Sequence, residues 1–477
     1  MTTILAIDQG TSGTKAIVVD AEDGTVAIAE EPVRPTYLPG GGVEQNPHEL
    51  LDSVLTAGRR AVSTAGRPID AVALANQGET VLAWDSATGT PLSQAIVWQD
   101  RRADSICAEL AEYGEAIARR TGLVLDPYFS APKMAWVRRH LTREGVVTTT
   151  DTWLVHHLTG EFVTDASTAS RSLILDLDSA SWDGELSDWF HLGEERLPRI
   201  VASDEVVGTT RAFGQETPVA GLIVDQQAAL VAEACLEQGT AKCTYGTGAF
   251  LLANTGLNPV RSSAGLTTSV AWQAAGQTLY CVDGQVYTVA SAVRWLQDLG
   301  LVQSATDLDA VVATDSQGVL CVPAFAGLAG PWWAPEATAS LTGMTLATRR
   351  EHLILAVLQG IAAQVTELAS LVGRDLGRPL SRLRADGGLT NSAALMQAQA
   401  DIAQLPVDVY PNAHATPLGA AALARCALDP ALSLKEAVGD WQPTTAYAPR
   451  WSEDRAQEFR TTWAQAATAC ATKGDNS

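Results

Sequence analysis

The sequence predicts a two-domain α/β protein with a cleft between its halves. The chain has 477 residues, which is more than one ordinary hydrophobic core holds. Short apolar strands are followed by helical stretches, a pattern typical of sheets that are covered by helices. A strand, a glycine-containing tip and a second strand occur twice, at residues 4–20 and 241–256. We therefore expect a duplicated architecture, with one domain at residues 1–238 and the other at residues 239–477.

The N-terminal half is expected to begin with an antiparallel meander. Three apolar runs are joined by a glycine-rich loop and by an Asp-Gly turn, which are typical strand connections. Further along, apolar residues at helical spacing predict helices. The expected order is strands at 4–8, 15–20 and 26–33, a helix at 47–65, a strand at 69–77, a strand running into a turn at 80–92, and a helix at 101–120.

The C-terminal half repeats this theme without a repeat in the residues themselves. Its expected elements are two strands around a Gly-Thr-Gly tip at 241–256, strands at 266–273 and 278–284, helices at 289–299 and 350–372, and a strand, a Gly-Gly turn and a helix at 380–402. The polar end of the chain from residue 471 is expected to fray.

Charge and cysteine content argue against several classes of protein. The chain has 54 acidic and 32 basic residues and a net charge of −22, so we expect neither nucleic acid nor a membrane surface as a partner. The seven cysteines lack CxxC or metal-binding spacing, which predicts free, mostly buried thiols. We find no basic leader and no apolar run of about 20 residues, and we expect a cytoplasmic protein.

The first glycine-rich loop holds more hydrogen-bond donors than a turn requires. It combines glycines, hydroxyls and a lysine: Gly10, Thr11, Ser12, Gly13, Thr14 and Lys15. The glycines permit close backbone approach and positive φ, and the donors form a nest suited to phosphate. Asp8, at the strand end, can hold a Mg²⁺ ion carried by that phosphate. The alternative is a polar hairpin loop that binds nothing, and the GxxxxGK[ST] spacing of a P-loop is absent.

Nine ordered blocks carry a family resemblance. They read AIDQGTSGTKA, NQGET, AIVWQDRR, DPYFSAPKMAW, VDQQAAL, TYGTGAFLLANTG, VPAFAGL, SLTGMTL and DGGLTNSAALMQAQADI. Together they resemble the FGGY family of carbohydrate kinases, and within it most closely the glycerol kinases, over residues 4–424. The resemblance implies two actin-like, ribonuclease-H-like ATPase domains that close over ATP and a sugar or polyol. It also implies Mg²⁺, a homodimer, and transfer of the γ-phosphoryl group to a hydroxyl.

Asp225 follows an apolar run and precedes a helical stretch. Taken alone, this pattern favours a helix N-cap, worth about 1 kcal/mol. Its position resembles that of the family's catalytic base, which accepts the proton of the attacking hydroxyl. Under the resemblance, Asp8 and Asp225 are the carboxylates associated with Mg²⁺.

The resemblance also implies a nucleotide site that is built from three glycine-containing turns. Its residues are Gly10, Thr11, Ser12, Gly13, Thr14, Lys15, Gly246, Thr247, Gly248, Gly387, Gly388 and Asn391. Lys15 stands where glycerol kinases carry an arginine, and a lysine supplies the charge without the bidentate geometry. For residues 246–248, the alternative is a turn that only the fold requires.

The acceptor site implied by the resemblance mixes polar and aromatic groups. Its residues are Gly78, Glu79, Trp98, Tyr128, Asp225, Gln226 and Phe250. Carboxylates and amides bind hydroxyls while aromatic faces pack on carbons, which suits a polyol. Taken singly, Trp98 and Tyr128 are more typical of core aromatics.

Gly78 departs from the family pattern, because glycerol kinases carry an arginine there that donates to a glycerol hydroxyl. The loss of a charged hydrogen bond is worth about 1.5–3 kcal/mol, and the missing side chain leaves space. Either another residue supplies the donor, or the acceptor is larger than glycerol, such as erythritol, a pentitol or a ketopentose such as xylulose. A second departure, at residues 334–340, has no assigned consequence.

Two other functions fit parts of the pattern. A non-catalytic sugar sensor on the same fold would be expected to lack Asp8 or Asp225, and a DNA-binding regulator would need an added basic helix-turn-helix. A chaperone-like or filament ATPase leaves the block of Glu79, Trp98 and Tyr128 unexplained. The sequence therefore predicts an ATP-dependent kinase that acts on a small polyol or sugar.

Overall fold

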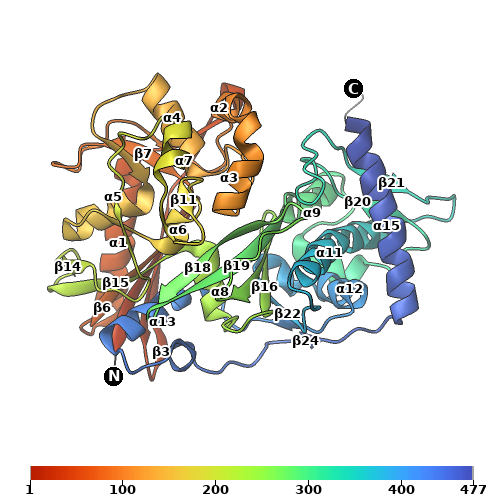
Figure 1. The fold of residues 1–477 in the computed structure, drawn as a ribbon. Helices are drawn as coiled ribbons and strands as arrows, with labels where there is room; N and C mark the ends of the chain where they lie inside the picture. Colours follow the sequence, from red (N-terminus) through yellow and green to blue (C-terminus); the bar gives the residue numbers. More distant parts are fainter. Residues whose placement is uncertain (1, 475–477) are drawn as a thin grey trace.

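The structure, a computed structural model, describes residues 2–474. Two mixed β-sheets, one from each half of the chain, are flanked by helices, and this confirms the predicted α/β class (Figure 1). The hairpin formed by β18 (Thr267–Ala274) and β19 (Gln277–Val286) lies between the two parts of the molecule (Figure 1).

The N-terminal sheet has the strand order β14-β15-β6-β1-β2-β3. Its strands are β1 (Thr3–Gln9), β2 (Gly13–Asp20), β3 (Gly24–Pro32), β6 (Ala71–Asn76), β14 (Gly208–Thr210) and β15 (Thr217–Val224). β2 is antiparallel to β1 and β3, so the predicted meander is confirmed. β6 is parallel to β1, and β15 is parallel to β6, so these three strands end at the same edge.

The C-terminal sheet has the order β18-β19-β17-β16-β22-β23-β24. Its other strands are β16 (Ala241–Tyr245), β17 (Ala249–Gly256), β22 (Leu383–Asp386), β23 (Val407–Val409) and β24 (Ala446–Tyr447). From β19 to β23 the strand directions repeat those from β3 to β15, with two antiparallel pairs followed by two parallel pairs. The predicted duplication therefore holds for strand direction, although β19 rather than β18 pairs with β17.

The two faces of the N-terminal sheet are covered by helices from different parts of the chain. Because successive side chains of a strand point to opposite faces, β1 contributes to two cores. Leu5 and Ile7 pack in the core that includes α1 (Pro47–Ala65). Ile4 and Ala6 pack in the core that includes α8 (Asp225–Ala232) and α13 (Ala415–Leu428). The C-terminal half thus supplies α13 and also α14 (Leu434–Val438) to the N-terminal core, and the division at residue 238 stays a prediction.

The helix α11 (Arg350–Asp375) is the central helix of the C-terminal core. By length and composition alone it could cross a membrane, with a mean hydropathy of 1.5 over its most apolar window. However, 83% of that window is buried inside the protein. This is the pattern of a core helix.

A smaller sheet of five strands, which the sequence analysis did not predict, extends the N-terminal part. Its strands are β4 (Thr36–Leu38), β5 (Gly42–Gln45), β7 (Val81–Trp84), β8 (Ala95–Ile96) and β9 (Val146–Thr149). The remaining N-terminal helices are α2 (Asp104–Glu109), α3 (Gly114–Thr121), α4 (Ser130–His140), α5 (Thr150–Thr159), α6 (Ala166–Ala169) and α7 (Gly184–Trp189). The remaining C-terminal helices are α9 (Ala290–Asp298), α10 (Leu308–Val311), α12 (Ala393–Ala403), α14 (Leu434–Val438) and α15 (Glu453–Gly474).

Two local predictions were wrong. The expected helix at 101–120 is broken into α2 and α3, and the break brings Tyr113 against Trp189 with ring centroids 4.9 Å apart. The end expected to fray from residue 471 is helical as far as Gly474, and residues 475–477 lie outside the described part. The prediction for the cysteines is confirmed, because all seven are free.

Candidate active site

Three parallel strands bring the predicted reacting groups to one edge of the N-terminal sheet. β1, β6 and β15 run in register, with Gln9 and Val224 both paired with Asn76. Asp8 therefore lies at the end of β1, and Asp225 is the first residue beyond β15. Ligands of parallel α/β sheets bind at the carboxyl ends of the strands, so this edge is where a site is expected.

Asp225 is the first residue of α8, and its carboxylate faces the site. Its Oδ1 accepts a hydrogen bond of 2.6 Å from the backbone N–H of its neighbour Gln226. The N-cap position belongs to Val224, which has no side-chain cap, so the capping interpretation is wrong. Burial, and then the charge of Glu79, raise the pKa of Asp225 to about 6, against the opposing effect of the Gln226 N–H. A carboxylate with a raised pKa is a better proton acceptor.

Asp8 shares this site with Asp225. Burial, and then the negative charge of Asp225, raise the pKa of Asp8 to about 7, and the charge of Lys15 opposes the shift. A buried carboxylate whose ionisation is disfavoured by a neighbouring carboxylate suits a divalent cation with oxygen ligands. Within residues 2–474 no group of three or more His, Cys, Asp or Glu residues could hold a metal ion. A Mg²⁺ ion here would therefore depend on water and phosphate for its other ligands, as Mg²⁺ usually does.

The first hairpin tip is closed by a hydrogen bond of 3.0 Å from Gly10 N to Gly13 O. The expectation of positive φ was wrong, because neither glycine has it. Glycine is instead required at position 13 because the backbone of β3 passes close to it. An added Cβ would lie 2.8 Å from the Glu31 carbonyl oxygen of β3. The Thr14 hydroxyl is directed to α1, where it lies 2.6 Å from Ser53 Oγ. The Thr11 hydroxyl accepts from the Trp98 indole at 2.9 Å.

The second tip is shorter than the first but is also closed by a backbone hydrogen bond between two glycines. Gly246 N donates to Gly248 O at 2.9 Å, and α9 begins against the tip through Ala290 N to Gly246 O at 3.1 Å. An added Cβ on Gly248 would lie 2.4 Å from a backbone oxygen of β19. Close packing therefore accounts for this glycine by itself, and a phosphate contact stays a prediction.

The Gly-Gly turn follows β22, which is parallel to β16, so the turn lies beside the second tip. Gly387 has a φ of 93° and approaches the Tyr245 backbone so closely that a Cβ would lie 2.5 Å from its oxygen. Gly388 and Asn391 are exposed, and Asn391 Nδ2 donates to Gly388 O at 3.0 Å. The structure thus gathers two of the three predicted nucleotide turns at adjacent strand ends.

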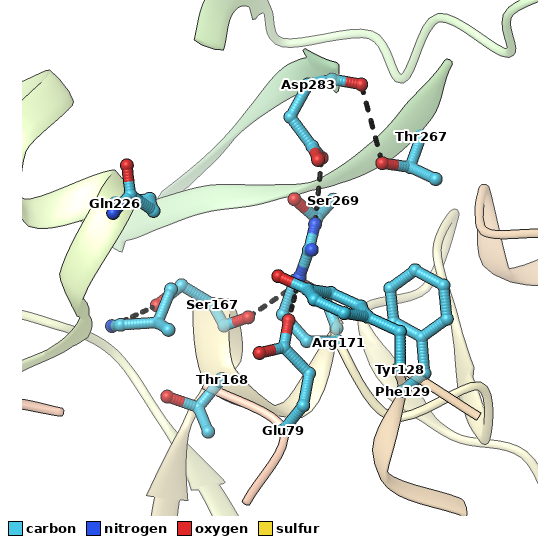
Figure 2. A network of polar contacts seen from close by, with 12 residues as sticks. Glu79, Tyr128, Phe129, Ser167, Thr168, Arg171, Gln226, Thr267, Ser269 and Asp283 are labelled. Carbon is cyan, nitrogen blue, oxygen red and sulfur yellow. Dashed lines mark hydrogen bonds and ion pairs between the residues drawn. The ribbon is translucent and has the colours of Figure 1, made fainter. Parts of the chain in front are cut away.

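The predicted acceptor residues surround a buried arginine that the sequence analysis missed. Arg171 Nε donates to Glu79 Oε1 at 2.6 Å, and its Nη1 donates to Asp283 Oδ1 at 2.8 Å (Figure 2). The guanidinium lies 5.6 Å from the centre of the Tyr128 ring, which in turn packs edge-on to Trp98 at 5.5 Å. Glu79 has a positive φ of 59°, an uncommon conformation for this residue type.

Two buried lysines, also missed, hold predicted acceptor residues in place. Lys133 Nζ donates to three carbonyls, those of Pro127, Tyr128 and Phe129, and so fixes the turn that carries Tyr128. Burial lowers the pKa of Lys133 to about 7. Lys242 Nζ donates to Gln226 Oε1 at 2.8 Å, which leaves the amide nitrogen of Gln226 to act as a donor.

Lys242 interrupts the first apolar strand predicted within 241–256, and Asp283 lies within the strand predicted at 278–284, so both carried a usable signal. Lys133 lies on α4, a helix that was not predicted, and Arg171 lies in a loop after α6, so neither carried a comparable signal. Phe250 lies on β17 and packs against the core around α8 and α13, so its role at the acceptor stays a prediction.

Gly78 is buried between β6 and β7, next to the residue that precedes Asp225. An added Cβ would lie 3.0 Å from a Val224 methyl group, and the φ of Gly78 is not positive. The backbone therefore does not require glycine here. An added Cβ meets one neighbouring methyl group, that of Val224.

A groove of about 430 Å³ lies elsewhere, between the end of α11 and Leu405. None of the predicted site residues lines it. We therefore place the candidate active site by its carboxylates and strand ends, and not by cavity size.

Comparison with known proteins decides the family. Residues 3–232 match the N-terminal domain of the FGGY family of carbohydrate kinases, and residues 241–428 match its C-terminal domain. The chain belongs to the FGGY family of carbohydrate kinases. It is therefore an ATP-dependent kinase with the two-domain FGGY fold, as the resemblance implied.

Relatives of this FGGY kinase that match it over nearly its whole length include proteins named glycerol kinase. The chain is 43% identical to a glycerol kinase of Alkalilimnicola ehrlichii, over 98% of each chain. The structure is similar to that of Plasmodium falciparum glycerol kinase, solved with ADP, with a TM-score of 0.93, 31% identity and 98% coverage of each chain. A xylulose kinase from Lactobacillus acidophilus has a TM-score of 0.91 at 21% identity over the full length of both chains, and it shows the fold alone.

Proposed function

We propose that this FGGY kinase transfers the γ-phosphoryl group of ATP to a hydroxyl of a small polyol, and that glycerol is the first candidate. The observation that carries the proposal is the group formed by Asp8, Glu79 and Asp225 near the ends of three parallel strands, with Tyr128 brought to Glu79 through Arg171. The relatives named glycerol kinase, which are similar over nearly their whole length, support glycerol over other polyols.

In the proposed reaction, Asp225 orients the attacking hydroxyl and accepts its proton as the oxygen–phosphorus bond forms. The pKa of about 6 leaves this carboxylate ionised at neutral pH and close enough to neutrality to accept a proton. Because the transferring phosphoryl group is only loosely bonded in the transition state, positioning and charge stabilisation supply most of the acceleration.

We further propose that Asp8 and Asp225 hold Mg²⁺, and that the three glycine turns bind the nucleotide. When bound, the ion would neutralise charge on the phosphates. Its charge would also oppose the two causes that raise the pKa of Asp8, which are burial and then the negative charge of Asp225. The homodimer stays a prediction.

A larger acceptor is the second candidate, and Gly78 is the observation that favours it. Gly78 has no side chain, and it lies against Val224, the residue before Asp225. In this proposal a tetritol, a pentitol or a ketopentose takes the volume that the arginine of glycerol kinases would fill.

The test is a screen of ATP consumption over glycerol, erythritol, pentitols and ketopentoses, with Asp225→Asn as the matched variant. Acceptor-dependent turnover is expected with at least one polyol, and Asp225→Asn should lower it by about 10² or more. Nucleotide binding by the variant, measured by calorimetry, should remain close to that of the native chain. Near-normal turnover by the folded variant would contradict the role of Asp225 as the proton acceptor.

A further inference from the structure

The buried guanidinium of Arg171 is held in the middle of the predicted acceptor residues. Its side chain is 8% exposed, and the two carboxylates that it contacts, on Glu79 and Asp283, are 6% and 16% exposed. A buried charge is tolerated only where it is paired and hydrogen-bonded. Figure 2 shows the guanidinium between the two carboxylates, with the Tyr128 ring beside it.

The pairing of Arg171 is incomplete on one side. Nε and Nη1 each donate to a carboxylate, while Nη2 has no hydrogen-bond partner among residues 2–474. A guanidinium has five N–H donors in a rigid fork. The two contacts therefore fix its plane and leave the Nη2 donors for another molecule.

The charge of Arg171 also acts on the groups that the acceptor must meet. It opposes the rise in the pKa of Asp225 and of Glu79, and it lies 5.6 Å from the Tyr128 ring centre. Gly78, the neighbour of Glu79, has no side chain that could donate in this place. Among the described residues, Arg171 is the arginine whose guanidinium pairs with Glu79.

We propose that Arg171 donates from Nη2 to a hydroxyl of the acceptor that does not react, and that Asp283 positions the guanidinium for this contact. Arg171 and Asp283 are then specificity-determining residues of the acceptor site. This inference rests on the proposed function, because it assumes a polyol between Tyr128 and Asp225.

Comparison of acceptors that lack one hydroxyl separates a direct contact from a structural role. We would measure kcat/KM for glycerol, propane-1,2-diol and propane-1,3-diol with the native chain, Arg171→Ala and Arg171→Lys. A diol that is not turned over would be measured by its inhibition constant against glycerol. For Arg171→Ala, kcat/KM for glycerol should fall about tenfold or more, mainly through KM for glycerol.

The expected signature is a loss that depends on the acceptor. For the diol that lacks the contacted hydroxyl, Arg171→Ala should lower kcat/KM by about twofold or less. The native chain already lacks that hydrogen bond with this diol. KM for ATP should change by about twofold or less in the same variants. Asp283→Asn should show the same acceptor pattern with a smaller loss.

A control variant removes a similar arginine elsewhere. Arg138, which binds Glu195 through Nε and Nη2 at 2.7 and 2.8 Å, is half-buried and lies outside the site. Arg138→Ala should leave the ratios among the three acceptors unchanged. Unfolding temperatures identify any variant that is not folded. If Arg171→Ala is not folded, Arg171→Lys replaces it in the comparison of the three acceptors.

Equal losses for all three acceptors, in a folded variant, would overturn the contact and leave Arg171 a structural ion pair. If the native chain turned over none of the polyols, that result would instead contradict the proposed function. The two failures are thus distinguishable.

Discussion

At the scale of single residues, the burial of Asp8 beside Asp225 predicts opposite effects of Asp8 on stability and on activity. The pKa of Asp8 is raised from 3.8 to about 7, so the folded chain holds a proton that the unfolded chain releases. The stability of the ligand-free protein should therefore fall as the pH rises through this window.

Asp8→Asn removes this loss of stability at higher pH, because the amide cannot ionise. The unfolding temperature of the ligand-free variant should exceed that of the native chain by a few degrees at about pH 8, and the gap should close near pH 4. Phosphoryl transfer by the variant should be mostly lost. Thermal unfolding at both pH values checks this, and a gap that is independent of pH would contradict it.

Gly78 allows a second test at this scale. Gly78→Arg should raise the ratio of kcat/KM for glycerol to that for erythritol or xylulose, because the side chain adds a donor and fills space, each worth about 1–3 kcal/mol. The backbone conformation permits a side chain, since the φ of Gly78 is not positive, and an added Cβ would meet a Val224 methyl group at 3.0 Å. An unchanged ratio in a folded variant would show that this space is not part of the acceptor site.

At the scale of elements, the contact between α8 and α13 should be intolerant of added volume. An added Cβ on Gly419 of α13 would lie 1.8 Å from the Ala228 carbonyl oxygen of α8. Backbone atoms cannot move aside, so Gly419→Ala must separate the helices. Because α8 begins with Asp225, both stability and turnover should fall, with the free energy of unfolding lower by about 1–3 kcal/mol.

The matched control is Gly114→Ala on α3, where an added Cβ has nothing within 4 Å. That variant should be neutral or more stable by up to about 1 kcal/mol. Denaturant unfolding of both variants checks the pair. Equal stabilities would contradict the role of Gly419 as a required close contact.

At the scale of the whole molecule, the three predicted nucleotide turns are divided between the two sheets. The tip at 10–13 belongs to the N-terminal sheet with Asp8, while the tip at 246–248 and the turn after β22 belong to the C-terminal sheet. A kinase built in this way is expected to close over its substrates. Small-angle scattering with a non-hydrolysable ATP analogue and glycerol together should give a smaller radius of gyration than the ligand-free chain. Superimposable curves would count against closure.

The sequence alone determined the features that depend on local pattern. The apolar periodicity predicted α1 at its observed bounds, Pro47–Ala65, and the paired meanders predicted the duplicated strand directions. The ordered blocks predicted the family, and they named Asp8, Glu79 and Asp225 as site residues, which strand register then placed at one sheet edge. These features could be predicted because strand period, turn chemistry and helix spacing are properties of neighbouring residues.

Only the tertiary structure decided which distant residues complete the site. Arg171 lies 92 positions from Glu79 and 112 from Asp283 in the chain, and the ion pairs form because the loop after α6 meets β19. In the same way, α13 joins the N-terminal core because Gly419 lets it approach α8. Such contacts are set by packing between elements far apart in the sequence, and local periodicity carries no information about them.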